Sequence, residues 1–341
     1  MQINQSPHST LMWAFYFVQE CMNSIIENRF LKKASEDSIA HSRKQIIEQV
    51  GNTPLIELSS ISKEVKSVQI FAKAEWFNPG GSVKDRAALN MILQGEKSLA
   101  LTKDKIILDA TSGNTGIAYA MIGAALGYKV KLAIPQNAGH LFKQTLAAYG
   151  AELIYSNPQH GSDGAIREAI RLYEKAPEQY FYPDQYNNRA NWLAHYDGTG
   201  AEIIRQTKGK ITHFIAGLGT SGTFMGAGCR LKEFNEDIQL ISVQPDSPLH
   251  GLEGLKHMKS TILPGFYDAE LADDNLETST EESQLLVKRL AKEEGLLVGM
   301  SAGAALAAAL IIGKRLTTGV IVVIFPDSAH KYFDQRFWQE N

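Results

Sequence analysis

Cysteine is scarce in this sequence, and its scarcity excludes two classes of protein. Cys21 and Cys229 are the only two cysteines among 341 residues. They are too few for a disulfide framework, and they lack the spacing of metal ligands. Such a chain is typical of compartments that keep thiols reduced, so we expect a cytoplasmic protein without a bound metal.

Charge of one sign and long membrane-type apolar runs are also lacking. The formal net charge is −3, which gives no reason to expect nucleic acid as a partner. The run "LMWAFYFV" at 11–18 is shorter than the ~20 residues of a membrane helix, and no lysine or arginine precedes it as in a secretory signal. We therefore expect no membrane partner, and we interpret residues 1–43 as an appended helical extension whose apolar run packs on a protein surface.

Short β-branched runs alternate with longer helical patterns from residue 45 onward. This alternation is typical of βα units around an open, mostly parallel sheet, so the predicted fold class is α/β. The segment "AGAALAAALIIG" is apolar on all sides and predicts a buried helix. The predicted strands are 68–74, 105–111, 129–135, 151–156, 212–218, 238–245 and 319–326.

Four turns between predicted strands and helices combine glycine with hydroxyl side chains. They read "NPGGSVKDR" at 78–86, "TSGNTG" at 111–116, "GLGTSGT" at 217–223 and "GMSAGA" at 299–304. In open parallel sheets ligands bind where strands end and helices begin, because helix starts offer unpaired N–H groups and partial positive charge. These turns are therefore the candidate ligand-binding segments.

The turns at 217–223 and 111–116 both suit anions. Glycines in the first let the backbone approach a phosphate, while hydroxyls and N–H groups donate to its oxygens. In the second, Ser112, Thr115 and the loop N–H groups are arranged to hold a carboxylate, and Asn114 carries both a donor and an acceptor. An ordinary capping turn remains the alternative for each.

Lys84 lies in the first turn of a predicted helix, where the helix dipole disfavours a cation. A lysine held there has a lowered pKa, which makes its amine a better nucleophile and base for Schiff-base chemistry. Asp85 beside it offsets part of this argument, and a solvated surface lysine is the alternative.

A phosphate cup, a carboxylate cup and an amine nucleophile together predict pyridoxal phosphate as cofactor and an amino acid as substrate. A nicotinamide dehydrogenase needs Gly-x-Gly-x-x-Gly after an early strand, but the nearest match, "GLGTSG", falls late in the chain. A non-catalytic small-molecule binding protein remains an alternative, although it has no use for Lys84.

These turns, with "GNTPLIEL" at 51–58, resemble the pyridoxal-phosphate enzymes of fold type II that catalyse β-replacement, namely cysteine synthase and cystathionine β-synthase. The similarity covers residues 45–332, and the five stretches occur in the family's order. It implies a two-domain α/β fold in which each domain is an open, mostly parallel twisted sheet flanked by helices. The implied segments are a helical extension at 1–43, a smaller substrate-binding domain at 78–188, a larger cofactor-binding domain at 44–77 and 189–330, and a tail at 331–341.

The resemblance also implies roles for individual residues. Lys84 would bond the cofactor aldehyde and act as the catalytic base. Ser301 would face the pyridine nitrogen without keeping it protonated, which favours elimination over a long-lived carbanion. The ring oxygen would be bound by Asn114, the phosphate by Gly219, Thr220, Ser221, Gly222 and Thr223, and the substrate carboxylate by Thr111, Ser112, Thr115 and Gln185.

The implied reaction is the replacement of the leaving group of an O-activated serine by sulfide, with O-acetylserine as the leading substrate. Cystathionine β-synthase activity on serine and homocysteine is the alternative. Some family members that accept O-phosphoserine carry an arginine in the loop that corresponds to 248–268, and Lys256 falls near that place. The family also leads us to expect a homodimer.

Overall fold

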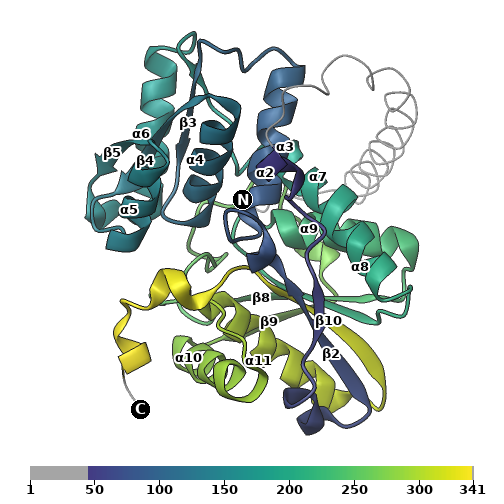
Figure 1. The fold of residues 1–341 in the computed structure, drawn as a ribbon. Helices are drawn as coiled ribbons and strands as arrows, with labels where there is room; N and C mark the ends of the chain where they lie inside the picture. Colours follow the sequence, from purple (N-terminus) through teal and green to yellow (C-terminus); the bar gives the residue numbers. More distant parts are fainter. Residues whose placement is uncertain (1–44, 340–341) are drawn as a thin grey trace, which may run out of the picture. The chain divides into compact units, whose positions relative to one another are not determined.

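Two sheets hold the strands of the computed structural model, which describes residues 45–339 (Figure 1). The larger sheet has six strands in the order β1-β2-β10-β7-β8-β9, and only β1 runs antiparallel to its neighbour. Its strands are β1 (Leu55–Glu57), β2 (Val68–Ala74), β7 (His213–Gly217), β8 (Gln239–Pro245), β9 (Asp274–Thr278) and β10 (Gly319–Phe325). The predicted extension at 1–43 lies outside the described residues.

The smaller sheet has four strands, all parallel, in the order β5-β4-β3-β6. These are β3 (Ile106–Ala110), β4 (Lys129–Pro135), β5 (Glu152–Ser156) and β6 (Tyr180–Phe181). The α-helices that pack around the two sheets are α2 (Gln45–Glu48), α3 (Lys84–Lys97), α4 (Asn114–Leu126), α5 (His140–Ala148), α6 (Gly161–Lys175), α7 (Arg189–Ala194), α8 (Ala201–Gln206), α9 (Gly222–Phe234), α10 (Thr280–Arg289) and α11 (Met300–Arg315). Within residues 45–339, none of the helices is both long and apolar enough to cross a membrane.

The larger sheet is covered on both faces, as the continuous apolar run of β10 requires. Ile321 and Val323 pack into the cluster that contains the buried side chains of α11, whereas Val322 and Ile324 pack into the cluster of α9. Successive side chains of a strand point to opposite faces, so a strand buried on both sides is apolar throughout. Figure 1 shows α10 and α11 together against one side of this sheet.

The smaller sheet is also covered on both faces, but by side chains of different size. Ile107 and Leu132 pack with buried residues of α3 and α4. On the other face, Ala110 and Ala133 meet Ala165 of α6, so small side chains allow this helix to approach closely. Each sheet is therefore a separate layer between helices.

The predicted α/β class and the two sheets flanked by helices are confirmed. The seven predicted strands occur within one residue of their expected ends, and the apolar segment 302–313 lies inside the buried helix α11. The sequence missed β1 and β6, which have three and two residues, and β9, whose side chains alternate in exposure. The domain boundaries remain a prediction.

Candidate active site

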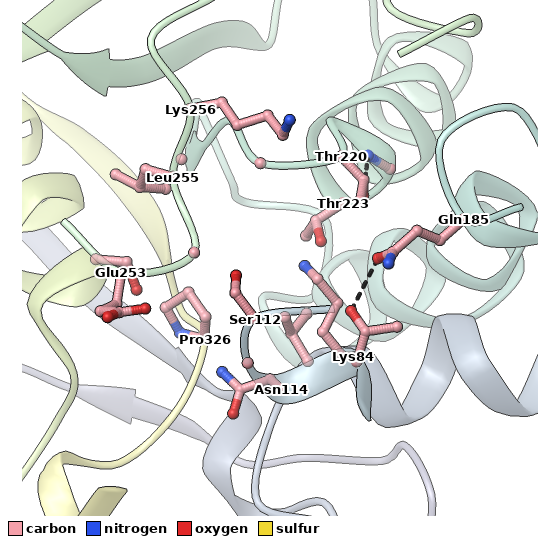
Figure 2. Close-up of a pocket in the computed structure, with 18 of the residues that line it drawn as sticks. Lys84, Ser112, Asn114, Gln185, Thr220, Thr223, Glu253, Leu255, Lys256 and Pro326 are labelled. Atoms are coloured by element: carbon pink, nitrogen blue, oxygen red, sulfur yellow. Dashed lines mark hydrogen bonds between the residues drawn. The ribbon is translucent and has the colours of Figure 1, made fainter. Parts of the chain in front are cut away.

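The four glycine-rich turns converge on one pocket (Figure 2). It is formed where α3, α4, α9 and α11 begin, which is also where the preceding β-strands or loops end. Every residue that the sequence predicted for the site lines this pocket: Lys84, Thr111, Ser112, Asn114, Thr115, Gln185, Gly219, Thr220, Ser221, Gly222, Thr223, Lys256 and Ser301.

Lys84 is the first residue of α3, and Figure 2 shows its amine pointing into the pocket. Burial lowers the pKa of this amine below its ordinary value, and the negative charge of Asp327 opposes part of that shift. The predicted lowering of the pKa is thus reproduced, but burial is its main cause. The nearby charge that acts on Lys84 comes from Asp327 rather than from Asp85, whose carboxylate accepts a hydrogen bond from Gly80 N at 2.5 Å.

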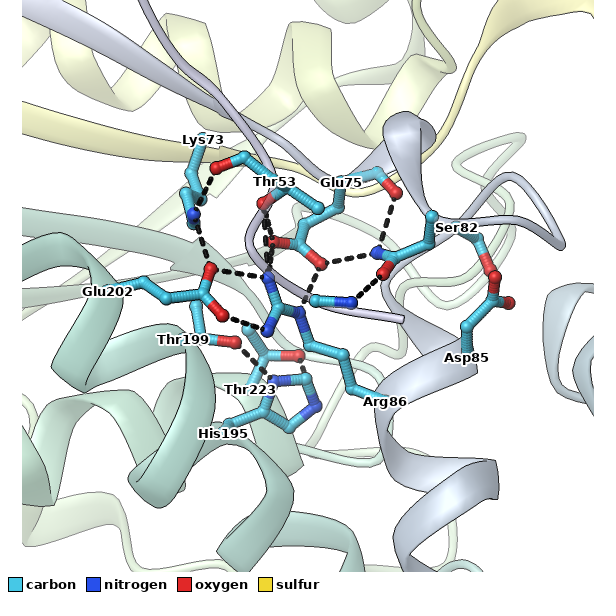
Figure 3. A network of polar contacts seen from close by, with 12 residues as sticks. Thr53, Lys73, Glu75, Ser82, Asp85, Arg86, His195, Thr199, Glu202 and Thr223 are labelled. Atoms are coloured by element: carbon cyan, nitrogen blue, oxygen red, sulfur yellow. Dashed lines mark hydrogen bonds and ion pairs between the residues drawn. The ribbon is translucent and has the colours of Figure 1, made fainter. Parts of the chain in front are cut away.

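An ion network anchors the first turn of α3 (Figure 3). Arg86 donates through Nε to Glu75 and through Nη1 to Glu202, at 2.7 Å in both cases. Lys73 of β2 donates to the same Glu202 carboxylate at 2.7 Å. All four side chains are less than a tenth exposed, so the network joins β2, α3 and α8 in the interior and holds the turn that carries Lys84.

The turn at 219–223 has the features of a phosphate site. A Cβ added to Gly219 would lie 2.3 Å from the Gly254 carbonyl oxygen, so only glycine allows this close approach of two backbones. Ser221 has a φ of 63°, and its buried hydroxyl has no hydrogen-bond partner among the described residues. The helix α9 begins at Gly222, and its first N–H groups are those that an anion can satisfy.

Two buried side chains contact the hydroxyl groups of Thr220 and Thr223 in this turn, and the sequence did not predict either of them. Asn191 Nδ2 donates to Thr220 Oγ1 at 3.2 Å. His195 lies in a single π-helical turn, His195–Gly200, with Nε2 3.4 Å from Thr223 Oγ1 and Nδ1 3.0 Å from Thr199 Oγ1. Burial, together with the charges of Arg86 and Lys84, lowers the pKa of His195 well below its ordinary value, so its ring is neutral.

In the turn at 111–115, some side chains form hydrogen bonds within the protein and one faces the pocket. Thr111 Oγ1 accepts from Gly113 N and Gly116 N, both at 3.1 Å, and so closes the loop on itself. Thr115 donates to Gln185 Oε1 at 2.9 Å, which ties the turn to the opposite wall. Ser112 is exposed, and its hydroxyl faces the pocket in Figure 2.

The loop after β8 contributes two charged side chains to the pocket, Lys256 and Glu253. Lys256 Nζ lies 4.7 Å from the centre of the Tyr186 ring. Burial lowers the pKa of this lysine, and the charge of Asp163 opposes the shift. Glu253 lies on the same loop and also lines the pocket, and burial raises its pKa. Glu253 and Tyr186 were not predicted: no recognisable motif surrounds Glu253, and Tyr186 lies on a different segment, after β6, directly following the predicted Gln185.

A family model described as pyridoxal-phosphate dependent enzyme matches residues 46–327. That range contains every strand of both sheets and every predicted site residue. The chain therefore belongs to the family of pyridoxal-phosphate-dependent enzymes.

Similar proteins narrow the class further. The chain is 50% identical over 297 residues to a cysteine synthase of Aquifex aeolicus (strain VF5), and the match covers 85% of this chain and 91% of that protein. A crystal structure of cysteine synthase from Entamoeba histolytica has a TM-score of 0.83 at 32% identity and covers 91% of this chain and 94% of that one. An O-acetylserine-dependent cystathionine beta-synthase from Helicobacter pylori has a TM-score of 0.81 at 33% identity, with coverage of 86% and 98%. Within the family, the chain belongs with the cysteine synthases.

The pocket residues fit pyridoxal phosphate. The cofactor presents an aldehyde, a phosphate and a polar aromatic ring, and each needs a different partner. The amine of Lys84, whose pKa is lowered, suits the aldehyde. The Ser221 hydroxyl, which has no hydrogen-bond partner within residues 45–339, and the start of α9 suit the phosphate. Ser301, buried in the first turn of α11, offers a neutral hydroxyl to the ring.

Proposed function

We propose that the chain forms L-cysteine by replacing the leaving group of an O-activated serine with sulfide, and that O-acetylserine is its principal substrate. The observation that carries this proposal is the convergence in one pocket of the Lys84 amine, whose pKa is lowered, with two separate glycine- and hydroxyl-rich turns that open helices. The relatives named as cysteine synthases support the same reaction. Cystathionine formation has weaker support, from the Helicobacter pylori structure alone among the proteins named above.

The cofactor would be held by residues of four different turns. Lys84 would bond its aldehyde, Asn114 its ring oxygen and Ser301 its ring nitrogen. The residues proposed for its phosphate are Gly219, Thr220, Ser221, Gly222 and Thr223. When bound, pyridoxal phosphate supplies a conjugated ring that accepts electron density from the bond broken at the substrate α-carbon.

Lys84 is the proposed acid and base. Because burial lowers its pKa, a larger share of the amine is neutral near physiological pH and can accept a proton at Nζ. The same ammonium then returns the proton to the α-carbon of the product. One lysine in both roles makes a separate histidine or carboxylate base unnecessary, and the neutral, buried His195 serves instead to support Thr223.

The turn at 111–115 would bind the substrate carboxylate. Ser112 is the best placed of its side chains, because its hydroxyl faces the pocket, and the first N–H groups of α4 add donors. Thr115 and Gln185 would complete the wall. Thr111, proposed from the family resemblance to contact the carboxylate, has its hydroxyl bonded inside the turn, so we assign it to shaping the loop.

A product assay tests the reaction. The purified chain is loaded with pyridoxal phosphate and incubated with sulfide and, separately, O-acetylserine, O-phosphoserine or serine, and cysteine is quantified. We expect cysteine from O-acetylserine. Serine with homocysteine is included as a further reaction, and cystathionine from that mixture without cysteine from any sulfide mixture would overturn the proposal.

We propose that Lys256 allows the enzyme to accept O-phosphoserine as well, whose leaving group is phosphate. Its ammonium lies in the pocket wall, where it can neutralise a phosphate as a point charge but without the two-pronged geometry of arginine. We expect Lys256→Ala to lower kcat/KM for O-phosphoserine by about tenfold, the ~1.4 kcal/mol of one charge-assisted hydrogen bond, and to spare O-acetylserine. Steady-state kinetics on both substrates measures this.

Lys259→Ala is the matched control for that experiment. Lys259 lies on the same loop but is 75% exposed, and its amine contacts Glu277 at 3.3 Å. Its removal should change neither substrate's kcat/KM. Equal losses for the two substrates in Lys256→Ala, or the same loss in Lys259→Ala, would rule out a contact between Lys256 and the leaving phosphate.

We also propose the division into a substrate-binding domain at 78–188 and a cofactor-binding domain at 44–77 and 189–330. The two sheets support it, because β3 to β6 fall within the first range and all other strands within the second. A tail at 331–341 follows, although Tyr332 still lines the pocket. A cytoplasmic homodimer is proposed from the low cysteine content and the family resemblance.

A further inference from the structure

The side-chain amide of Asn114 lies between two opposite charges near the end of the chain. Its Nδ2 donates to Asp327 Oδ2 at 2.7 Å, and its Oδ1 accepts from Lys331 Nζ at 2.6 Å. Neither Asp327 nor Lys331 belongs to the glycine-rich turns, since both follow β10.

These two charges leave the amide only one favourable orientation. The two ends of an asparagine amide have nearly the same shape, so packing alone hardly distinguishes them. A carboxylate can only accept and an ammonium can only donate. A flipped amide would place its oxygen against the Asp327 carboxylate and its NH₂ group against the Lys331 ammonium, which loses both hydrogen bonds and brings like partial charges together.

We propose that Asp327 and Lys331 are positioning residues, which fix the orientation of the Asn114 amide so that its second N–H is offered to the bound cofactor. This inference rests on the proposed function, in which Asn114 binds the cofactor ring oxygen. Figure 2 shows the amide nitrogen on the pocket side of Asn114 and the oxygen on the far side. An NH₂ group has two hydrogens; Asp327 accepts one of them, and the Tyr332 hydroxyl is the other described group that interacts with this amide.

The pair is itself held in place by the surrounding backbone and side chains. Tyr332 donates its hydroxyl to Asp327 Oδ2 at 2.5 Å. Lys331 Nζ also donates to the carbonyl oxygen of Gly81 at 3.1 Å. Gly81 has a φ of 79°, which favours glycine, and this turn leads directly into Lys84. Lys331 therefore connects the amide of Asn114 with the turn that carries the catalytic lysine.

Cofactor titrations of the apo-protein test the inference. The readouts are the dissociation constant for pyridoxal phosphate and the position of the visible absorption band, which responds to a hydrogen bond at the ring oxygen. Asp327→Asn is the deciding variant, because it keeps the shape of the side chain but removes the preference that the carboxylate imposes on the orientation of the amide. We expect a rise of about three- to tenfold in the dissociation constant and a shift of band intensity to shorter wavelength, as for loss of a directed hydrogen bond.

A second variant and a mutant cycle separate positioning from general damage. Lys331→Met, which keeps the length of the side chain without its charge, should act in the same direction, and Lys331→Arg should restore most of the wild-type behaviour. In an Asn114→Ala background, Asp327→Asn should have a clearly smaller effect, because the amide through which it acts is gone and only the charge of Asp327 on Lys84 is still removed. Melting temperatures of the apo-proteins identify any variant that has lost its fold.

Each outcome is decisive. Unchanged titrations in folded Asp327→Asn, or equal effects of this change with and without Asn114, would overturn the inference and leave the proposed function intact. If Asn114→Ala itself binds the cofactor like the wild type, both the inference and the proposed contact of Asn114 fail. A wild-type protein that binds no pyridoxal phosphate would instead contradict the proposed function.

Discussion

Replacing Lys84 with alanine is expected to lower the rate of cysteine formation by about a thousandfold or more. The variant loses the group that takes and returns the α-proton, and general acid–base catalysis alone contributes about 10²–10⁴-fold. It also loses the amine that would bond the cofactor aldehyde, so the band that borohydride bleaches in the wild type should be absent. Single-turnover kinetics with O-acetylserine and an absorption spectrum measure the two effects.

Lys97→Ala is the control for this substitution. Lys97 is an exposed lysine in the last turn of the same helix, far from the helix start at which Lys84 lies. It should retain wild-type turnover and spectrum. Wild-type turnover in Lys84→Ala would remove this lysine from the mechanism.

Arg86→Met is expected to cause the largest loss of stability. Arg86 and Glu75 are almost completely buried, and Glu202 is nearly so. Without the guanidinium, Glu75 is left as a buried carboxylate without its ionic partner, which costs about 3–5 kcal/mol of the free energy of unfolding, or on the order of 10 °C in Tm. Thermal and denaturant unfolding of the apo-protein measure the loss.

A surface ion pair provides the comparison. Arg171 donates to Glu168 at 2.7 Å on α6, but its side chain is 59% exposed. Solvent screening weakens such an exposed pair, so Arg171→Met should hardly change Tm. If Arg86→Met and Arg171→Met had the same Tm, the buried network would contribute no more to stability than the surface ion pair.

The pH dependence of this effect follows from Glu202. Burial alone raises the pKa of Glu202, but hydrogen bonds and charges from Arg86 and Lys73 outweigh it and lower the pKa from 4.5 to about 2. A carboxyl group whose pKa is lowered by folding stabilises the protein fully above its unfolded pKa and progressively less as the pH falls. The difference in stability between the wild type and Arg86→Met should therefore shrink between about pH 4.5 and about pH 2.

The sequence predicted the location of the pocket because the relevant signals are local. Each glycine-rich turn follows a strand or loop and opens a helix, and parallel strands end at the same edge of a sheet. Lys84, the turn at 111–115 and the turn at 219–223 could therefore be placed together without coordinates. The strands were predicted equally well wherever their apolar runs extended to five residues or more.

The partners of those turns could not be predicted, because their contacts join distant parts of the chain. Asp327 and Lys331 lie more than 200 residues after Asn114 in the sequence, and only the folded chain brings them together. His195 contacts Thr223 from a π-helical turn, and the spacing of histidines in the sequence gives no indication of this contact. Glu202 is an ordinary helix residue in the sequence, and only the fold shows that it faces Arg86.

The order of strands in the larger sheet also determines when this sheet can be completed while the chain is being synthesised. β10 is the last strand in the sequence, yet it lies between β2 and β7 and pairs with both. During synthesis β2 therefore emerges long before its parallel partner, and it exposes an unpaired, apolar edge until the ribosome has released residues 319–325. The smaller sheet, whose strands are all complete by residue 181, has no such delay. Nascent chains that stall before β10 should consequently be the ones that recruit chaperones or aggregate.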